Sequence, residues 1–202
     1  MLLTGIHCEG YLDELITKVL IKRILREEGV DSDIEFRVSH ADTGLTDRSI
    51  KAAVSLFGDI KPPCNLAVFI TDQDGNTDKL RNLTSMIKNQ IDGLFDDYAI
   101  LACPEPNIEN WLLKEEDAIK NIFLLDAANQ LPESNISEPK ARLKTIIKIF
   151  NKDLTKNHND ICFEITKLLN ISKLKSVDRS FDCFHSSLVS KIRRNISKSR
   201  KN

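Results

Sequence analysis

The stretch Leu66-Ala67-Val68-Phe69-Ile70-Thr71-Asp72-Gln73-Asp74-Gly75 decides the fold. Its first five residues are apolar and rich in β-branched and aromatic types, which is typical of a strand buried on both faces of a parallel sheet. In an open α/β sheet, ligands bind beyond the carboxyl ends of the strands, where the two aspartates would emerge. An extended backbone would direct Asp72 and Asp74 to the same face, with roughly 7 Å between their Cα atoms. We therefore expect the functional site at this edge of the sheet.

The two neighbouring carboxylates predict a cation site. Carboxylates this close repel each other unless a cation or a proton lies between them. Hard, oxygen-binding ions such as Mg²⁺ or Mn²⁺ suit such a pair. The alternative is a polar strand end followed by a turn, because Asp and Gly are common turn residues. A calcium loop fits less well, since Gly75 stands at the fourth position counted from Asp72 rather than the sixth.

The residues around this stretch alternate between strand-like and helix-like patterns. Strands are expected at 1–8, 33–38 and 98–103 in addition to 66–70, and helices at 11–28, 46–56 and 77–94. This order predicts an α/β fold, with a mostly parallel central sheet flanked by helices. From Asn107 onward the apolar spacing is almost wholly helical, which predicts an all-helical C-terminal extension. We divide the chain into an α/β core, 1–106, and a helical extension, 107–202, packed on it as one compact unit.

Composition places the chain among soluble proteins of the cytoplasm. The 202 residues include five widely spaced cysteines without a CxxC pair, which favours reduced structural thiols over a zinc site. The N-terminus lacks the pattern of a signal peptide, and no apolar run is long enough to cross a membrane. We therefore expect no membrane association.

Charge patterning points to nucleic acid only locally. The formal net charge is -1, so the chain as a whole is not basic. Its C-terminal part, however, carries Lys191, Arg193 and Arg194 in a run without acids, and such a segment can follow a phosphate backbone. The alternative is a solvated helix end, where cations are favoured by the helix dipole.

Further acids are expected at the same edge as the aspartate pair. Glu9 ends the first expected strand, and the carboxyl ends of parallel strands meet at one edge. Glu9, Asp72 and Asp74 suit phosphoryl transfer, with the aspartates on the metal and Glu9 as general acid/base or ligand of a second metal. Glu109 follows the fourth strand and would either assist at the metal or simply favour a helix start. Lys140 opposes the dipole near a helix start, which suggests contact with a phosphate.

Two of these segments resemble TOPRIM domains. Cys8-Glu9-Gly10-x-x-Asp13 and Val68-Phe69-Ile70-Thr71-Asp72-Gln73-Asp74-Gly75 are similar to the signature found in type IA and II topoisomerases, bacterial primases and nucleases of the overcoming-lysogenization-defect type. The resemblance implies a TOPRIM/Rossmann-like fold and metal-dependent strand cleavage or nucleotidyl transfer. It also implies that Glu9, Asp72 and Asp74 are the catalytic, metal-binding acids.

A closer resemblance covers most of the chain. The segments at 104–113, 138–140 and 179–184 resemble, in order, the P-x-x-E-x-W-L-L-x-D, D-P-K and S-F-x-x-F segments of small stand-alone TOPRIM-like bacterial proteins. Those proteins are often encoded beside ATPases in phage-defence loci, which implies an ATPase partner and a role in defence. The pattern departs after Leu113, where Glu115 or Asp117 must stand for the usual aspartate. The residue pattern alone, without the resemblance, predicts that Trp111, the one tryptophan of the chain, is a core anchor.

Two alternative functions stay open. In a haloacid-dehalogenase-type phosphatase, Asp72 would be the nucleophile and Asp74 the acid/base. That motif normally lies on the first strand of its domain, and Glu9 would then have no role. The second alternative is a non-catalytic TOPRIM-like module that senses nucleic acid or docks to an ATPase. A divalent-metal-dependent nuclease acting on DNA or RNA is our preferred hypothesis.

Overall fold

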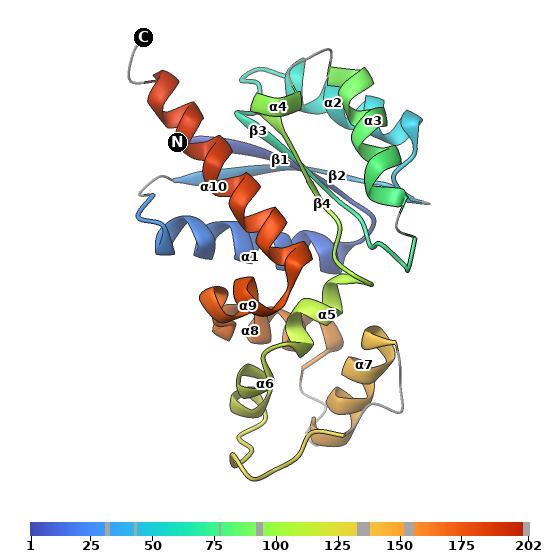
Figure 1. Cartoon of the computed structure of the whole chain (residues 1–202), viewed down its shortest axis with the longest axis vertical. Helices are drawn as coiled ribbons and strands as arrows, with labels where there is room; N and C mark the ends of the chain where they lie inside the picture. Colours follow the sequence, from blue (N-terminus) through green and yellow to red (C-terminus); the bar gives the residue numbers. More distant parts are fainter. Residues whose placement is uncertain are drawn as a thin grey trace.

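The protein has an α/β fold, as the sequence predicts. A computed structural model describes residues 1–30, 33–42, 44–76, 78–91, 95–132, 138–151 and 156–199. Its four strands all run parallel in the order β2-β1-β3-β4 (Figure 1). They are β1 (Leu2–Cys8), β2 (Ile34–His40), β3 (Leu66–Ile70) and β4 (Ala99–Ala102). Successive strands are linked by helices, as parallel pairing requires.

Helices cover both faces of the sheet (Figure 1). One face packs on α2 and α3 through a smaller apolar cluster, and the other packs on α1, α10 and the rest of the extension through a larger one. The helices of the first half are α1 (Tyr11–Glu27), α2 (Asp47–Gly58), α3 (Lys79–Ile91) and α4 (Phe95–Tyr98). Those of the second half are α5 (Ile108–Leu113), α6 (Glu116–Ile122), α7 (Pro139–Phe150), α8 (His158–Leu168), α9 (Ile171–Val177) and α10 (Arg179–Ser199).

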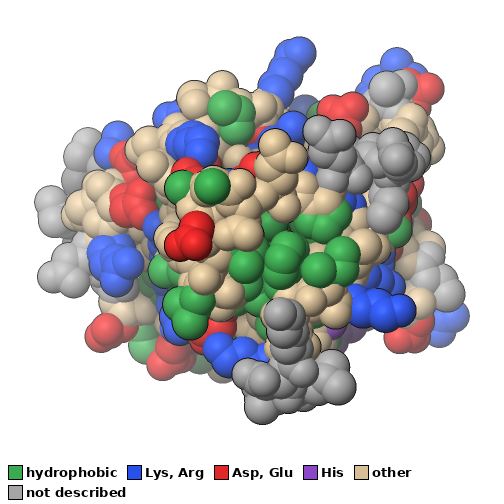
Figure 2. Space-filling model, turned by 90° about the horizontal axis from the view of Figure 1, so that it is seen from below, with side chains coloured by type: hydrophobic (Ala, Val, Ile, Leu, Met, Phe, Trp, Pro, Cys, Tyr) green, Lys and Arg blue, Asp and Glu red, His purple; other side chains and the backbone are tan. Residues whose placement is uncertain are grey.

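The helical extension presents an apolar face to solvent around the ends of α6 and α7. Leu124 is 91% exposed and Ile149 is also exposed, while the rings of Phe123 and Phe150 lie 5.9 Å apart. Figure 2 shows the molecule from this side, with hydrophobic side chains gathered near the centre of the face. No helix among the described residues is both long enough and apolar enough to cross a membrane.

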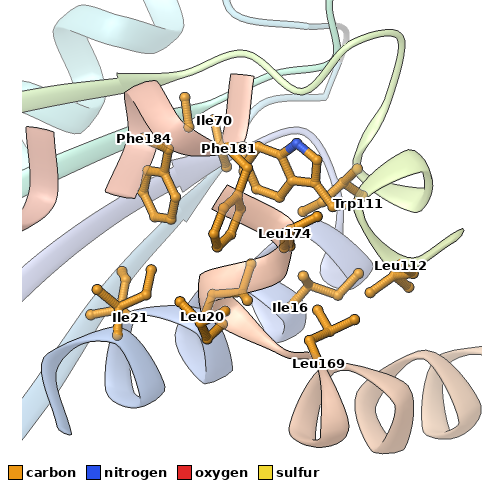
Figure 3. Close-up of a cluster of buried hydrophobic side chains, with 14 of the residues drawn as sticks. Ile16, Leu20, Ile21, Ile70, Trp111, Leu112, Leu169, Leu174, Phe181 and Phe184 are labelled. Carbon is orange, nitrogen blue, oxygen red and sulfur yellow. The ribbon is translucent and has the colours of Figure 1, made fainter. Parts of the chain in front are cut away.

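The extension and the sheet share the larger apolar core (Figure 3). Trp111 of α5 is fully buried, with its ring 5.2 Å from that of Phe181 and stacked 5.8 Å from that of Phe184, both on α10. Its indole N–H donates to Ser180 Oγ at 2.8 Å, so the one polar atom of the ring is paired. Trp111 therefore lies where the sequence predicts a core anchor.

Gly5 explains why a glycine interrupts the apolar opening of the chain. β1 is a central strand, and the ring of Phe57 from α2 packs directly against the backbone at Gly5. A Cβ atom added there would lie 2.5 Å from the Phe57 ring, closer than carbon atoms can approach. The glycine thus permits the close contact between helix and sheet on this face.

The expected strand 98–103 is shorter in the structure, where β4 covers Ala99–Ala102, and the ends of the expected helix 77–94, at 77 and 92–94, lie outside the described residues. α3 runs from Lys79 to Ile91, and the short helix α4 precedes β4. The pairing between the two neighbouring chain segments nevertheless continues beyond β3 and β4, because the N–H groups of Gln73 and Asp74 donate to the carbonyls of Pro104 and Pro106 at 3.0 and 2.9 Å. This pairing fixes the acidic loop against the start of α5.

Candidate functional site

The structure brings Glu9 and Asp74 together around one lysine. Lys79 Nζ lies 3.8 Å from Glu9 Oε1 and 3.3 Å from Asp74 Oδ2, and it also donates to the main-chain oxygen of Asp72. The hydroxyl of Thr71 donates to Glu9 Oε1 and orients that carboxylate. The acids that follow β1 and β3 therefore meet at the carboxyl edge of the sheet.

The carboxylate of Asp72 is hydrogen-bonded to α5. Its Oδ1 accepts a hydrogen bond of 3.0 Å from the backbone N–H of Ile108, the first residue of α5. The expectation of an extended backbone through Asp72 and Asp74 is wrong, because β3 ends at Ile70 and Asp74 adopts a left-handed conformation with φ 52°. The two carboxylates therefore have different partners, the Ile108 N–H for Asp72 and Lys79 for Asp74.

Burial and neighbouring acids keep Asp72 and Asp13 protonated to unusually high pH. Burial, followed by the charges of Asp13 and Glu109, raises the pKa of Asp72 to about 7. Burial also raises the pKa of Asp13 to about 6, with Glu109 and Glu9 adding to the effect, although the Gly10 N–H donates to its Oδ2 at 3.0 Å. These mutual effects show that the carboxylates of the first, third and fourth strand ends share one region.

Glu109 and Lys140 form a second pair at this edge. Glu109 is 1% exposed, and Lys140 Nζ lies 4.0 Å from its Oε1. Glu138 places Lys140 there, since its carboxylate accepts the N–H groups of Lys140 and Ala141 at the start of α7 and the side-chain amide of Asn107. The start of α7 is thereby tied to the start of α5.

Asp13 and Lys79 belong to the site, although neither is among the site residues predicted from the sequence, where Asp13 appears only within the segment Cys8-Glu9-Gly10-x-x-Asp13. Asp13 looks like an ordinary first-turn acid, and it does cap α1 by accepting the N–H of Gly10. Its spacing of four residues from Glu9 is the feature of the sequence that could have indicated a role for Asp13 in the site. Lys79 is the first residue of α3, where a cation opposes the helix dipole, and that conflict was the signal for a role outside the helix.

Lys191, Arg193 and Arg194 lie far from the acids. The next described polar residue of α10, Asn195, donates to the main-chain oxygen of Asn65, which directly precedes β3. The basic end of α10 therefore lies at the amino edge of the sheet, about 20 Å along the strand from the acidic loop. Arg193 pairs with Glu28 at 2.7 Å, and Arg194 with Asp97 at 3.6 Å. The structure does not join these three cations to the acidic site.

The donor set fits a divalent cation in chemistry, while the side chains are held apart. In the described part of the chain, no three His, Cys, Asp or Glu side chains are arranged to hold one metal ion. Each carboxylate has another partner: Thr71 for Glu9, Lys79 for Asp74 and a backbone N–H for Asp72. Yet the acids of this edge outnumber its two lysines, Lys79 and Lys140. Burial first, and then the charges of Asp13 and Glu109, raise the pKa of Asp72. A hard cation would offset this excess of negative charge after rotation of the side chains.

Comparison with known proteins leaves the family unassigned. No protein-family model, curated protein or solved structure matches the chain. The TOPRIM resemblance stays a prediction from the motifs.

An open cleft of about 550 Å³ gives solvent access to the Glu9 side of the site. The loop after β2 forms its opposite wall, and Gly44 faces Glu9, since a Cβ atom on Gly44 would lie 4.0 Å from Glu9 Oε1. The lining residues are Glu9, Ala41, Asp42, Gly44, Leu45, Asp74 and Lys79. Glu9, Asp74 and Lys79 are therefore the members of the site that a ligand entering this cleft would meet.

The raised pKa values predict that the metal-free protein loses stability as pH rises. Asp72 of the unfolded chain ionises near its ordinary value of 3.8, whereas in the folded chain it keeps its proton to about 7. Between these values the folded state binds more protons, so the free energy of unfolding falls with pH, by about 3 kcal/mol between pH 5 and pH 8. Urea unfolding in EDTA at pH 5 and pH 8 measures this difference. An equal difference in Asp72→Asn would contradict the assignment to Asp72.

Proposed function

We propose that the chain is a divalent-metal-dependent phosphoryl-transfer enzyme, a TOPRIM-type nuclease acting on DNA or RNA. One observation carries the proposal: acids from separate segments of the chain, Glu9 and the pair Asp72 and Asp74, meet at the carboxyl edge of a parallel sheet. Asp13 and Glu109 add negative charge to the same region. Metal-dependent phosphoryl transfer needs such a set of oxygen ligands.

Glu9, Asp72 and Asp74 would hold Mg²⁺ or Mn²⁺, with Glu109 and Asp13 supporting the group. The ion, when bound, would polarise a phosphate and stabilise negative charge in the transition state. Thr71 orients the Glu9 carboxylate at the wall of the cleft, where it can accept a proton from an attacking water. Lys140, half exposed beside Glu109, is in a position to contact a substrate phosphate.

A cleavage assay tests the proposal. Supercoiled plasmid, single-stranded DNA and RNA are incubated with the chain in Mg²⁺, Mn²⁺ or EDTA, together with Glu9→Gln and the matched control Glu105→Gln. Glu105 is an exposed acid in the loop that follows β4. We expect metal-dependent cleavage that Glu9→Gln removes and Glu105→Gln keeps. Cleavage in EDTA, or equal cleavage by Glu9→Gln, would contradict the proposal.

The same assay addresses the phosphatase alternative. The Asp-x-Asp pair follows β3, the third strand along the chain, and the Asp72 carboxylate accepts the N–H of Ile108. A haloacid-dehalogenase-type nucleophile would instead form a phosphoaspartate on Asp72. Detection of that adduct by mass spectrometry after incubation with a phosphomonoester would replace the nuclease proposal.

A second role, docking to a partner protein such as an ATPase, is favoured by Leu124. This residue has φ 52°, a left-handed conformation that bulky side chains rarely adopt, and it is almost fully exposed. It follows Phe123, whose ring lies 5.9 Å from that of Phe150. An exposed apolar side chain that is held in a strained backbone conformation on an apolar face is typical of an interaction surface. We expect Leu124→Glu to abolish binding of the partner protein and to leave cleavage by the chain alone unchanged.

A further inference from the structure

Lys79 makes an unusual set of contacts for a lysine at a helix start. Its ammonium group faces oxygens that belong to the three acids proposed as metal ligands: the main-chain oxygen of Asp72 and the carboxylates of Asp74 and Glu9. The first turn of a helix carries a partial positive charge, so a cation is disfavoured there. The location of Lys79 therefore depends on these oxygens rather than on the helix.

The described residues of the loop between β3 and α3 form turns that place backbone and side-chain oxygens next to the lysine. Asp74 and Gly75 are consecutive left-handed residues, with φ 52° and 73°. The N–H of Asn76 donates to the Gln73 carbonyl, and the N–H of Lys79 to the Asn76 carbonyl. These turns direct the Asp72 carbonyl and the Asp74 carboxylate toward the Lys79 side chain, which is 23% exposed and lines the cleft.

We infer that Lys79 is a built-in counter-ion that competes with the divalent metal for Glu9 and Asp74 and thereby sets the metal affinity of the site. This inference rests on the proposed function. Without metal, the single positive charge limits repulsion between the two carboxylates. A doubly charged ion at the same carboxylates would repel the ammonium group, so Lys79 must leave them when the ion binds. Lys79 is a positioning residue in this account, and its flexible stem allows the movement.

Removal of the competing charge is expected to tighten metal binding. A unit charge within about 5 Å of a divalent ion weakens its binding by about tenfold even when water screens the interaction. A purely structural role predicts the opposite direction, because loss of the contacts would loosen the loop that carries Asp72 and Asp74. The direction of the change therefore separates the two explanations.

The experiment is a titration of the full chain with Mn²⁺. The concentration of free Mn²⁺ is measured from its electron paramagnetic resonance signal. The variants are Lys79→Met, Lys79→Gln, which keeps a donor for the Asp72 carbonyl, and Lys79→Arg, which keeps the charge. Lys167→Met is the matched control, since Lys167 pairs with Glu164 on α8, away from the site. We expect about tenfold tighter binding in the Met and Gln variants, and wild-type affinity in the other two. Thermal melting verifies that each variant is folded.

Each other outcome has a defined meaning. Unchanged or weaker Mn²⁺ binding in both neutral variants would overturn the role of Lys79. If the wild type nevertheless cleaves nucleic acid in Mn²⁺, the proposed function stands and only this inference fails. If neither the wild type nor the neutral variants bind Mn²⁺, the proposed function and the inference fail together.

Discussion

Asp72→Asn is expected to abolish catalysis while it stabilises the metal-free fold. Asparagine keeps the size of the side chain and an oxygen that can accept the Ile108 N–H, but it removes the charge that burial and neighbouring acids disfavour. At pH 8 this should raise the free energy of unfolding by about 4 kcal/mol. Loss of an anionic metal ligand should lower the rate of metal-dependent cleavage by about 10²- to 10³-fold. A gain in stability with a loss of activity is the behaviour of a functional residue that is held in an unfavourable environment.

The matched control for this variant is Asp78→Asn. Asp78 precedes α3, is exposed and pairs with Arg81 at 2.9 Å. Neutralising such an exposed pair changes stability by less than about 1 kcal/mol. Cleavage assays and urea unfolding in EDTA compare the two variants with the wild type. If Asp72→Asn is destabilised at pH 8, or cleaves as fast as Asp78→Asn, the functional assignment of Asp72 is wrong.

Trp111→Ala is expected to cost about 3–5 kcal/mol in the free energy of unfolding. The ring is fully buried against Phe181 and Phe184, so its removal leaves a large cavity between α5 and α10 (Figure 3). Ser180 Oγ also loses the indole N–H. Trp111 lies two residues after Glu109 and three after Ile108, whose N–H binds Asp72. We therefore expect Trp111→Ala to weaken Mn²⁺ binding as well.

Trp111→Phe separates the packing contribution from the hydrogen bond. Phenylalanine retains an aromatic ring between the helices and lacks the N–H, so a smaller loss of about 1–2 kcal/mol is expected. Chemical unfolding of both variants in EDTA gives the two values. A loss for Trp111→Ala no larger than that for Trp111→Phe would contradict the anchoring role.

The fold follows from local patterns in the sequence. The apolar run at 66–70 and the helical spacing around it specify a parallel sheet flanked by helices, because burial on both faces demands continuous hydrophobic strands. The meeting of Glu9 with the Asp72–Asp74 segment follows from topology alone, since parallel strands end at one edge. These features depend on hydrophobic periodicity, which a single sequence displays directly.

The details of the site depend on contacts between distant segments, which periodicity does not encode. The left-handed turn at Asp74 replaces the extended backbone expected there, so Asp74 pairs with Lys79 while Asp72 binds the Ile108 N–H. Lys140 reaches Glu109 only because Glu138 ties the starts of α5 and α7. Likewise, the basic end of α10 lies at the amino edge because of the direction in which the helix crosses the sheet. A charge run in the sequence does not reveal that direction.

The central claim is that Glu9 and the Asp72–Asp74 pair hold one divalent ion together. A crystal of the chain soaked in Mn²⁺, with diffraction recorded near the manganese absorption edge, tests this claim most directly. The account predicts an anomalous peak within about 2.5 Å of carboxylate oxygens of Glu9, Asp72 and Asp74, with the Lys79 ammonium group moved away from Glu9 and Asp74. A map with Mn²⁺ bound elsewhere, and with Lys79 still between Glu9 and Asp74, would contradict it.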